Sequence, residues 1–436
     1  MKVLFVYPRF RRHAESNPEL LEFVPMNEYL GSPSLGIAAI AAVTPAHWQV
    51  EYRDDRIEPA DRETDADLVA FSFFTPAASR AIELAAYFRA AGKRVVAGGI
   101  FPSALPDELT ASFDAVVVGE GEDSWRRLLA DFEAGALRPR YRAEHPVSLE
   151  ALPPPRVSLY IDKESERFQP DDYPVQTSRG CALGCHACAL PTSMGTRQRH
   201  LPLDHIVAQL AALGRAGKRA CLTEDTGWFP GNAAHRLRDL FDRMAELRAD
   251  ASAGPIAPIS YIGISLPMIL HTPRALLDKA RAAGVGMFYL VGGFDPISMR
   301  AFTGKDPRAL SRARDAIART LDAGIDPYTS FLIGLDDDDE GTADRILDFA
   351  ATSGIRKAEF AVFTPYPGTP SWYRLLAEGR ILSRDWSRYN DANVVFRPAQ
   401  MTPERLHADY LKLWREFYSS KGHFAQLPQL DRTIQF

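Results

Sequence analysis

Short, continuous apolar runs alternate with segments of helical spacing over the first part of the chain. The apolar runs predict strands at 3–6, 50–52, 68–71, 95–97 and 115–118. Helical spacing predicts helices at 34–43 and 77–91, and the polar stretch 8–27 is predicted to be a loop. Fully apolar strands joined by helices are typical of a parallel sheet covered on both faces. We therefore expect residues 1–148 to form a doubly wound, Rossmann-like α/β domain that binds ligands at the carboxyl ends of its strands.

A second series of strands and helices follows a proline-rich stretch. Three consecutive prolines at 153–155 stiffen the backbone, so residues 149–172 are predicted to be a linker. Strands are then predicted at 173–176, 219–222, 261–264, 287–291, 326–335 and 357–363, with helices at 206–216, 233–247, 273–283, 310–323 and 342–353. This alternation predicts a partial (β/α)6 TIM-like barrel over 173–385, with its active site at the carboxyl ends of the strands. Residues 386–436 are predicted to form a short α-helical C-terminal segment and tail.

Composition and charge exclude several classes of protein. The chain has 436 residues, of which 46% are hydrophobic and 25% charged, and a formal net charge of −5. Mild acidity argues against a nucleic-acid partner, and no apolar stretch reaches the ~18 residues of a membrane-spanning helix. The N-terminus leads directly into a predicted strand instead of the apolar region of a signal peptide. We expect a cytoplasmic protein that does not insert into membranes.

Three of the four cysteines fall within eight positions. Cys181, Cys185 and Cys188 are spaced C-x3-C-x2-C in a loop that follows the first predicted barrel strand. Thiolates are ligands for iron–sulfur clusters and for zinc, and three of them leave one iron of a [4Fe–4S] cluster open to a small molecule. The alternative is a structural zinc site, which needs a fourth ligand such as His186 or Cys221.

The cysteine motif and its neighbours resemble a known family. The segments are TSRGCALGCHAC at 177–188, GGIFPS at 98–103, VGEGE at 118–122 and TPYPGTP at 364–370. In their order along the chain, with the first two segments before the cysteine motif and the last after it, they resemble the radical S-adenosylmethionine (SAM) superfamily, in particular its subgroup with an N-terminal cobalamin (B12)-binding-type domain. The resemblance implies a [4Fe–4S] cluster on Cys181, Cys185 and Cys188 and reductive cleavage of SAM bound at the open iron. It also implies a small-molecule substrate and an external electron donor such as flavodoxin or ferredoxin.

Residues at the predicted strand ends are candidates for contacts with the two organic cofactors. For SAM they are Glu224, Asp225, Gly263, Ser265, Gly292, Asp295 and Ser330. For cobalamin they are Ser72, Thr75, Gly98, Gly99, Gly119 and Glu120. A carboxylate can accept hydrogen bonds from the ammonium group of SAM, although acidic residues also cap helices and glycines also form turns. The D-x-H-x-x-G signature of a cobalt-ligating histidine is absent, which leaves both cobalamin binding without histidine and a purely structural domain open.

Two departures from the family pattern bear on the reaction. Ala187 stands where the superfamily usually has an aromatic residue, and Phe294 where it usually has Glu. The main hypothesis is cobalamin-type methyl transfer to an unreactive centre of a small molecule in a biosynthetic pathway. The first alternative is non-standard SAM cleavage with 3-amino-3-carboxypropyl transfer to a small acceptor without cobalamin. The second is a zinc-stabilised binding module without catalysis.

Overall fold

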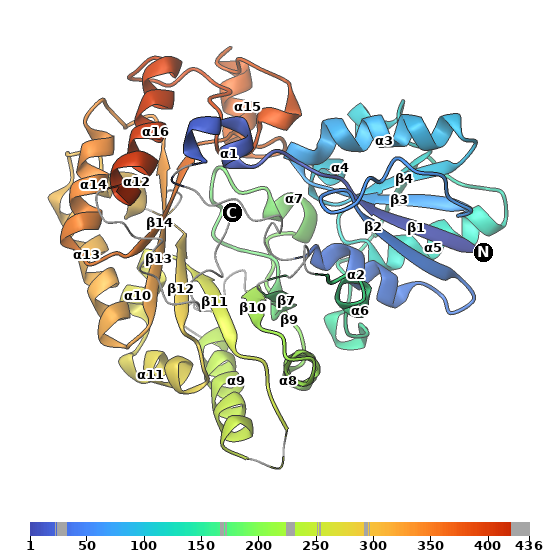
Figure 1. Ribbon diagram of the computed structural model, residues 1–436, viewed down its shortest axis with the longest axis horizontal. Helices are drawn as coiled ribbons and strands as arrows, with labels where there is room; N and C mark the ends of the chain where they lie inside the picture. The colour runs from blue at the N-terminus through green and yellow to red at the C-terminus, as the bar shows by residue number, and fades with distance from the viewer. Residues whose placement is uncertain are drawn as a thin grey trace.

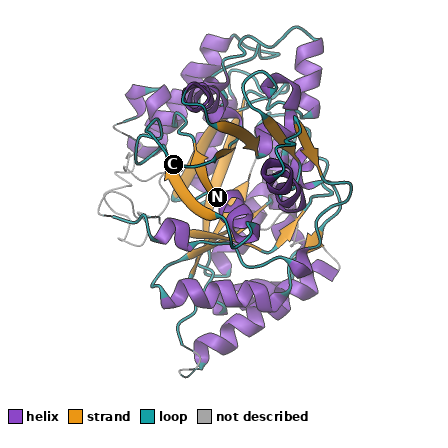
Figure 2. Ribbon diagram, turned by 90° about the vertical axis from the view of Figure 1, so that its right-hand side faces the viewer, coloured by secondary structure: helices purple, strands orange, loops and turns teal. Residues whose placement is uncertain are grey.

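The computed structural model describes residues 1–21, 23, 33–165, 170, 172–223, 232–250, 252, 254–291, 295 and 297–419. Two six-stranded sheets, each with all of its paired strands parallel, lie one after the other along the chain. Figure 1 shows the first sheet in blue and cyan and the second in green to orange. Figure 2 shows the strands at the centre of the molecule with helices around them. The predicted α/β fold class is confirmed.

The first sheet has the strand order β2-β1-β3-β4-β5-β6. Its strands are β1 (Lys2–Tyr7), β2 (Gln49–Asp54), β3 (Leu68–Ser72), β4 (Arg94–Gly98), β5 (Ala115–Val118) and β6 (Arg140–Arg142). Its main helices are α2 (Leu35–Val43), α3 (Ala78–Ala90), α4 (Ile100–Ala104) and α5 (Glu122–Glu133), and the 3-10 turns η2 (Thr75–Ala77) and η3 (Pro106–Leu109) lie between them.

Alternate side chains of β1 pack on opposite faces of this sheet. Val3 and Phe5 belong to the core that contains α2 and α5, and Leu4 and Val6 to the core that contains α3. Because both faces are covered, all four residues are apolar, which is why the strand appears as a continuous hydrophobic run.

The second sheet has the strand order β14-β13-β12-β11-β10-β7. Its strands are β7 (Tyr173–Gln176), β10 (Ala220–Thr223), β11 (Ile259–Ile264), β12 (Met287–Val291), β13 (Asp326–Ile333) and β14 (Lys357–Val362). The helices between them are α8 (Leu203–Arg215), α9 (Asn232–Ala249), α10 (Leu266–His271), α11 (Arg274–Ala282), α12 (Ser298–Ala301), α13 (Pro307–Asp322) and α14 (Thr342–Thr352). Since β7 and β14 are the two edges, the sheet is an open, partial barrel.

The predicted linker contains two short helical turns, η4 (Leu149–Ala151) and α6 (Ser158–Ile161). Tyr160 of α6 is fully buried against the first sheet. Its hydroxyl donates to the carbonyl of Ser34 and accepts from the backbone N–H of Ala38, at 3.1 Å, so it satisfies a donor in the first turn of α2. The segment is therefore anchored to the first sheet.

The two ends of the described chain meet over the barrel. α15 (Pro370–Ala377), η5 (Trp386–Arg388) and α16 (Pro403–Ser419) follow β14, and α16 packs on β14 and α14. The expected loop at 8–27 contains α1 (His13–Ser16) and η1 (Pro18–Leu20), which Figure 1 shows in blue beside the red helices. The hydroxyl of Tyr410 lies 2.9 Å from Nδ1 of His13. Among the described residues, no helix combines the length and apolarity needed to cross a membrane.

Candidate functional site

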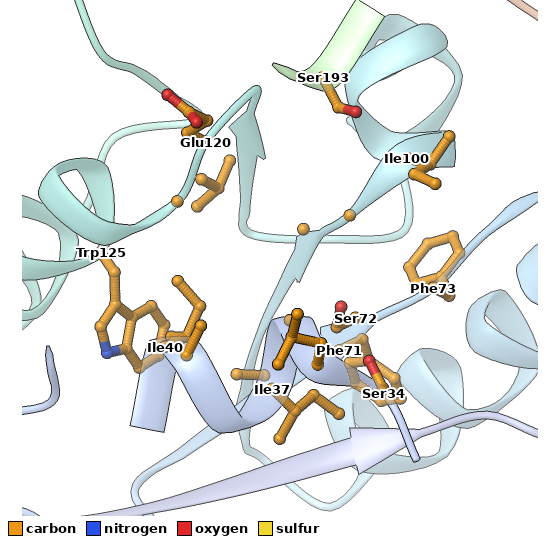
Figure 3. A pocket seen from close by; sticks show the side chains of 18 of the residues that line it. Ser34, Ile37, Ile40, Phe71, Ser72, Phe73, Ile100, Glu120, Trp125 and Ser193 are labelled. Carbon is orange, nitrogen blue, oxygen red and sulfur yellow. The ribbon is translucent and has the colours of Figure 1, made fainter. Parts of the chain in front are cut away.

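A mainly apolar cavity of about 330 Å³ lies at the carboxyl ends of β1, β3, β4 and β5. Figure 3 shows Ile37 and Ile40 of α2, Phe71 of β3 and Trp125 of α5 on its wall. Four further lining residues come from β7 and the segment that follows it: Gln176, Arg179, Ser193 and Met194. The cavity is therefore closed on one side by the segment that follows β7.

Five of the six residues predicted to contact cobalamin line this cavity, namely Ser72, Gly98, Gly99, Gly119 and Glu120. The sixth, Thr75, is buried at the start of η2 and is not among the lining residues. Sequence reasoning missed the wall formed by α2 and Trp125. The signal was present, because α2 (LGIAAIAAV) has no polar face although it lies beside the sheet.

Gly99 allows a close approach between two loops at the cavity. Its φ is +108°, a conformation that residues with a side chain rarely adopt. A Cβ atom added here would lie 2.6 Å from the carbonyl oxygen of Phe73, which also lines the cavity. The hydroxyl of Ser103 donates to the carbonyl of Gly99 and accepts from the N–H of Gly119, so it joins the loops after β4 and β5.

The three clustered cysteines lie on a loop that begins in a short hairpin. β8 (Ser178–Arg179) pairs antiparallel with β9 (Arg199–His200), and α7 (Leu190–Met194) lies between them along the chain. Gly180 has a φ of +86°, and a Cβ atom there would collide with the carbonyl oxygen of Arg197. Cys181 is 8% exposed, whereas Cys185 and Cys188 are half-buried.

The chemistry of the loop fits a cluster with three thiolate ligands. Burial, and then the neighbouring thiols of Cys188 and Cys181, raise the pKa of Cys185 to about 11. Side chains in the described ranges form no group of three or more His, Cys, Asp or Glu already arranged to hold a metal ion. Cys221 is buried in β10 and belongs to a different element. The donor set thus favours iron–sulfur chemistry over a closed zinc site.

The residues predicted to contact SAM are described in part. Glu224, Asp225 and Gly292 lie outside the described residues. Asp295 is close enough to Cys185 to contribute to its raised pKa, and its carboxylate also accepts backbone N–H groups of Ile297, at 2.9 Å, and Ser298, at 3.1 Å. Asp295 therefore caps the start of α12 and also lies near the cysteine loop.

The other three predicted contacts lie at the ends of β11 and β13. A Cβ atom added at Gly263 would have no neighbour within 4 Å, so there is open space beside β11. Ser265 is the N-cap residue of α10, and its side chain makes no capping hydrogen bond. Ser330 is 8% exposed on β13. The open space at Gly263 is an observation that fits a ligand, and the SAM role of all seven residues stays a prediction.

Two carboxyl groups at the barrel were not predicted. The Tyr289 hydroxyl donates to Glu359 Oε2 at 2.7 Å, and the Tyr366 hydroxyl donates to Asp391 Oδ2 at 2.9 Å. Burial raises the pKa of Glu359 to about 7 and that of Asp391 to about 6. Glu359 pairs with Ser330 in the register of β14 and β13, so it neighbours a predicted SAM contact. The sequence feature that could have identified Glu359 is that it is the single acidic residue in the mainly apolar strand KAEFAV.

Buried ion pairs join the cysteine hairpin to the cavity. Arg179 of β8 pairs with Glu120 and Glu122, and Arg199 of β9 also pairs with Glu120. Glu120, Glu122 and Arg179 line the cavity as well. Burial alone would lower the pKa of Arg179, but the carboxylates of Glu122 and Glu120 raise it. These ion pairs therefore connect the hairpin that carries the cysteine loop to the wall of the cavity.

Two family models match the sequence. One is described as the B12 binding domain and matches residues 30–129, and the other is described as the radical SAM superfamily and matches residues 175–350. The first match includes β3, β4 and β5 at the cavity, and the second includes the three cysteines of the loop. Together the two matches cover well over half of the chain.

The chain is similar along most of its length to known methyltransferases. It is 25% identical to the bacteriochlorophyllide d C-12(1)-methyltransferase of Chlorobaculum tepidum over 398 residues, which are 90% of this chain and 84% of the relative. It is 24% identical to the hopanoid C-2 methylase of Rhodopseudomonas palustris, over 95% of this chain and 76% of the relative. Its fold is similar to that of the radical S-adenosylmethionine methyltransferase TsrM from Kitasatospora setae, whose structure has cobalamin and a [4Fe–4S] cluster bound. The TM-score is 0.65 at 15% identity, covering 99% of this chain and 89% of TsrM.

The raised pKa of Glu359 predicts a specific dependence of stability on pH. The folded protein holds this proton more tightly than the unfolded chain, where a Glu titrates near pH 4.3, so the stabilising effect is complete below about pH 4.3 and is lost as the pH rises through about 7. The free energy of unfolding in urea should therefore fall between about pH 5 and about pH 8 relative to that of Glu359→Gln, by about 1.4 kcal/mol for each pKa unit. Glu404→Gln, at an exposed position in α16, is the control and should follow the wild type. Parallel curves for wild type and Glu359→Gln would contradict the prediction.

Proposed function

Because the chain belongs to the radical SAM superfamily and carries an N-terminal B12-binding domain, we propose that it transfers the methyl group of SAM to an unreactive centre of a small molecule. The observation that carries this proposal is the continuity of the two sites. Arg179 lines the cavity of the B12-binding domain and stands two residues before Cys181. A group bound in the cavity and a group bound on the cysteine loop would therefore be neighbours.

The proposed function also implies a division of the chain into domains. We assign residues 1–148 to the cobalamin-binding-type domain, 149–172 to the linker, 173–385 to the radical SAM barrel and 386–436 to the C-terminal segment. Cys181, Cys185 and Cys188 would hold the [4Fe–4S] cluster, and an external donor such as flavodoxin or ferredoxin would reduce it. When bound, the cluster, SAM and cobalamin supply the one-electron and methyl-carrying chemistry.

The cavity supports cobalamin as the partner of the cluster. Its wall is apolar and includes Trp125, which fits the aromatic base at the end of the nucleotide tail of cobalamin. Gly98, Gly99 and Gly119 let the backbone approach a ligand closely at the strand ends. No histidine occurs among the described residues that line the cavity, so the protein would bind cobalamin without a histidine ligand to cobalt.

The relatives support methyl transfer as the reaction. The names of two of them specify methyl transfer to a bacteriochlorophyllide and methylation of a hopanoid, and a second structure of TsrM holds tryptophan as substrate. These acceptors have little in common except that each is a small molecule. We therefore propose the reaction class, with a small organic acceptor bound between the barrel and the cavity.

A second candidate function rests on Ala187. This residue is buried within the cysteine loop, directly before Cys188, and offers no aromatic face to an adenine ring. SAM held differently would favour cleavage that releases a 3-amino-3-carboxypropyl group, in a reaction without cobalamin. The cavity argues for methyl transfer over this candidate.

The three clustered cysteines predict an iron–sulfur cluster that a single substitution destroys. Anaerobically purified wild-type protein should contain about four iron and four sulfide and absorb near roughly 400 nm. Cys181→Ala, Cys185→Ala and Cys188→Ala should each lose iron, sulfide and this absorbance, because no other thiol lies on the same loop. Cys221→Ala is the matched control, since it removes a buried thiol from β10, and it should keep the cluster. Zinc without sulfide in the wild type would establish the zinc alternative.

The products formed from SAM separate the two candidate reactions. With reductant and cobalamin under anaerobic conditions, methyl transfer predicts S-adenosylhomocysteine, together with 5′-deoxyadenosine if a radical also activates the acceptor. SAM with a deuterated methyl group should transfer the label to cobalamin, as mass spectrometry would show. 5′-Methylthioadenosine as the main nucleoside would overturn methyl transfer in favour of aminocarboxypropyl transfer.

Gly99→Ala should weaken cobalamin binding, because a Cβ atom would push the carbonyl of Phe73 at the cavity wall. We expect the dissociation constant, measured by equilibrium dialysis, to rise at least about tenfold, which corresponds to about 1.4 kcal/mol. Gly92→Ala is the matched control, since Gly92 also has a positive φ, of +75°, but no atom within 4 Å of an added Cβ. It should cost about 1 kcal/mol of stability and leave the affinity unchanged. Equal affinities in both variants would show that the cavity is not the cobalamin site.

A further inference from the structure

We propose that Arg179 and Arg199 are positioning residues, which set the distance and orientation between the cysteine loop and the cavity by binding Glu120 and Glu122. The proposal rests on the proposed function, because it takes the loop as the cluster site and the cavity as the cobalamin site. It adds a role for two arginines that were not predicted to contact either cofactor. The two arginines would act through the carboxylates at the cavity and through the hairpin that carries the cysteines.

Arg179 makes three hydrogen bonds that fix its side chain. Nη2 donates to Glu122 Oε1 at 2.6 Å, Nη1 donates to Glu120 Oε1 at 3.3 Å, and Nε donates to Gln176 Oε1 at 2.8 Å. Gln176 is the last residue of β7. The guanidinium therefore connects the end of a barrel strand to two residues that follow β5 of the first sheet.

Arg199 holds Glu120 from the other strand of the hairpin. Nη2 donates to Glu120 Oε1 at 2.8 Å and Nη1 donates to Glu120 Oε2 at 2.9 Å, so the pair is bidentate. The same nitrogens donate to the carbonyls of Met194 and Val147, and the N–H of Val147 donates to Glu120 Oε2 at 2.9 Å. Both carboxylate oxygens of Glu120 are thus fully used.

Burial makes this network an inefficient source of stability. The side chains of Arg179, Glu120 and Glu122 are 6%, 5% and 3% exposed, and that of Arg199 is 17% exposed. Removing two positive and two negative groups from water carries a large cost, and apolar side chains of similar volume often stabilise a protein equally well. What the network provides instead is a defined geometry, because planar guanidinium groups bind carboxylates in few orientations.

The network is connected rigidly to the cysteines. Arg179 and Arg199 face each other as a pair in the β8–β9 hairpin. Between Arg179 and Cys181 lies only Gly180, which packs against the backbone of Arg197. On the other side, Glu120 and Glu122 stand one and three residues after Gly119 at the cavity. A change in either arginine would therefore move the loop relative to the cavity without removing a ligand from either.

Charge-preserving substitutions test this role. Arg179→Lys and Arg199→Lys keep the positive charge but lose the forked geometry. We expect both variants to keep iron and sulfide. Arg199→Lys, whose side chain is not among those lining the cavity, should also keep its cobalamin affinity within about twofold of the wild type. The magnetic interaction between the reduced cluster and cob(II)alamin, measured by electron paramagnetic resonance, should become weaker or more heterogeneous. The rate of methyl transfer should fall about tenfold to a hundredfold, as expected for a displacement near 1 Å.

Two further variants complete the design. Arg197→Lys is the matched control, because Arg197 is exposed on the same loop, and it should behave as the wild type. Glu122→Gln keeps the shape of its side chain and serves as a milder disruption if a buried arginine cannot be replaced without loss of folding. It should weaken the magnetic interaction in the same direction.

The outcomes distinguish this proposal from the proposed function. A wild-type protein that binds no cluster or no cobalamin overturns both. A wild type with both cofactors whose magnetic interaction is unchanged in Arg179→Lys, Arg199→Lys and Glu122→Gln overturns only the positioning role. If all three variants fail to fold and therefore bind neither cofactor, the positioning role would also be overturned, because the network would then be structural.

Discussion

The buried ion pairs between the cysteine hairpin and the first sheet are the constraint on which the site depends. The two parallel sheets share a hydrophobic core, since one cluster of buried residues contains both Val3 of β1 and Phe331 of β13, and each sheet places its loops at the carboxyl ends of its strands. The contacts of Arg179 and Arg199 with Glu120 and Glu122 join these two sets of loops at the wall of the cavity. A buried charge without its partner is strongly unfavourable, so the two halves have one favourable arrangement at this point.

Elements with a strong local pattern were predicted correctly from the sequence. β3, β4 and β5 were found as continuous apolar runs, because strands covered on both faces have no polar side. The six barrel strands were also found: two have the predicted bounds, and the other four differ from them by one or two residues. The cysteine spacing predicted that all three thiols lie on a single loop, because Cys181, Cys185 and Cys188 fall within eight positions of the sequence. The comparisons confirm the family, and the ligand roles of individual residues stay predictions.

Elements that exist because of distant contacts were missed. α1 and η1 lie in the stretch expected to be a loop, where Asn17 Nδ2 donates to the carbonyl of Ala392 at 2.9 Å, across 375 positions of sequence. The linker contains α6, whose Tyr160 is buried against α2, and the short strand β6 completes the edge of the first sheet. None of these segments has enough residues to show a period, so tertiary packing decides their structure.

The charged groups divide the molecule into two chemical environments. At the cavity, each described carboxylate is bound by an arginine, so Glu120 and Glu122 are committed to holding the hairpin. At the barrel, Glu359 and Asp391 are bound by tyrosine hydroxyls, and burial raises their pKa values to about 7 and about 6. Asp391 also has a φ of +61°, a conformation that surrounding structure must hold in place. Burial therefore shifts the two carboxyl groups at the barrel towards neutral pH, while those at the cavity orient the hairpin.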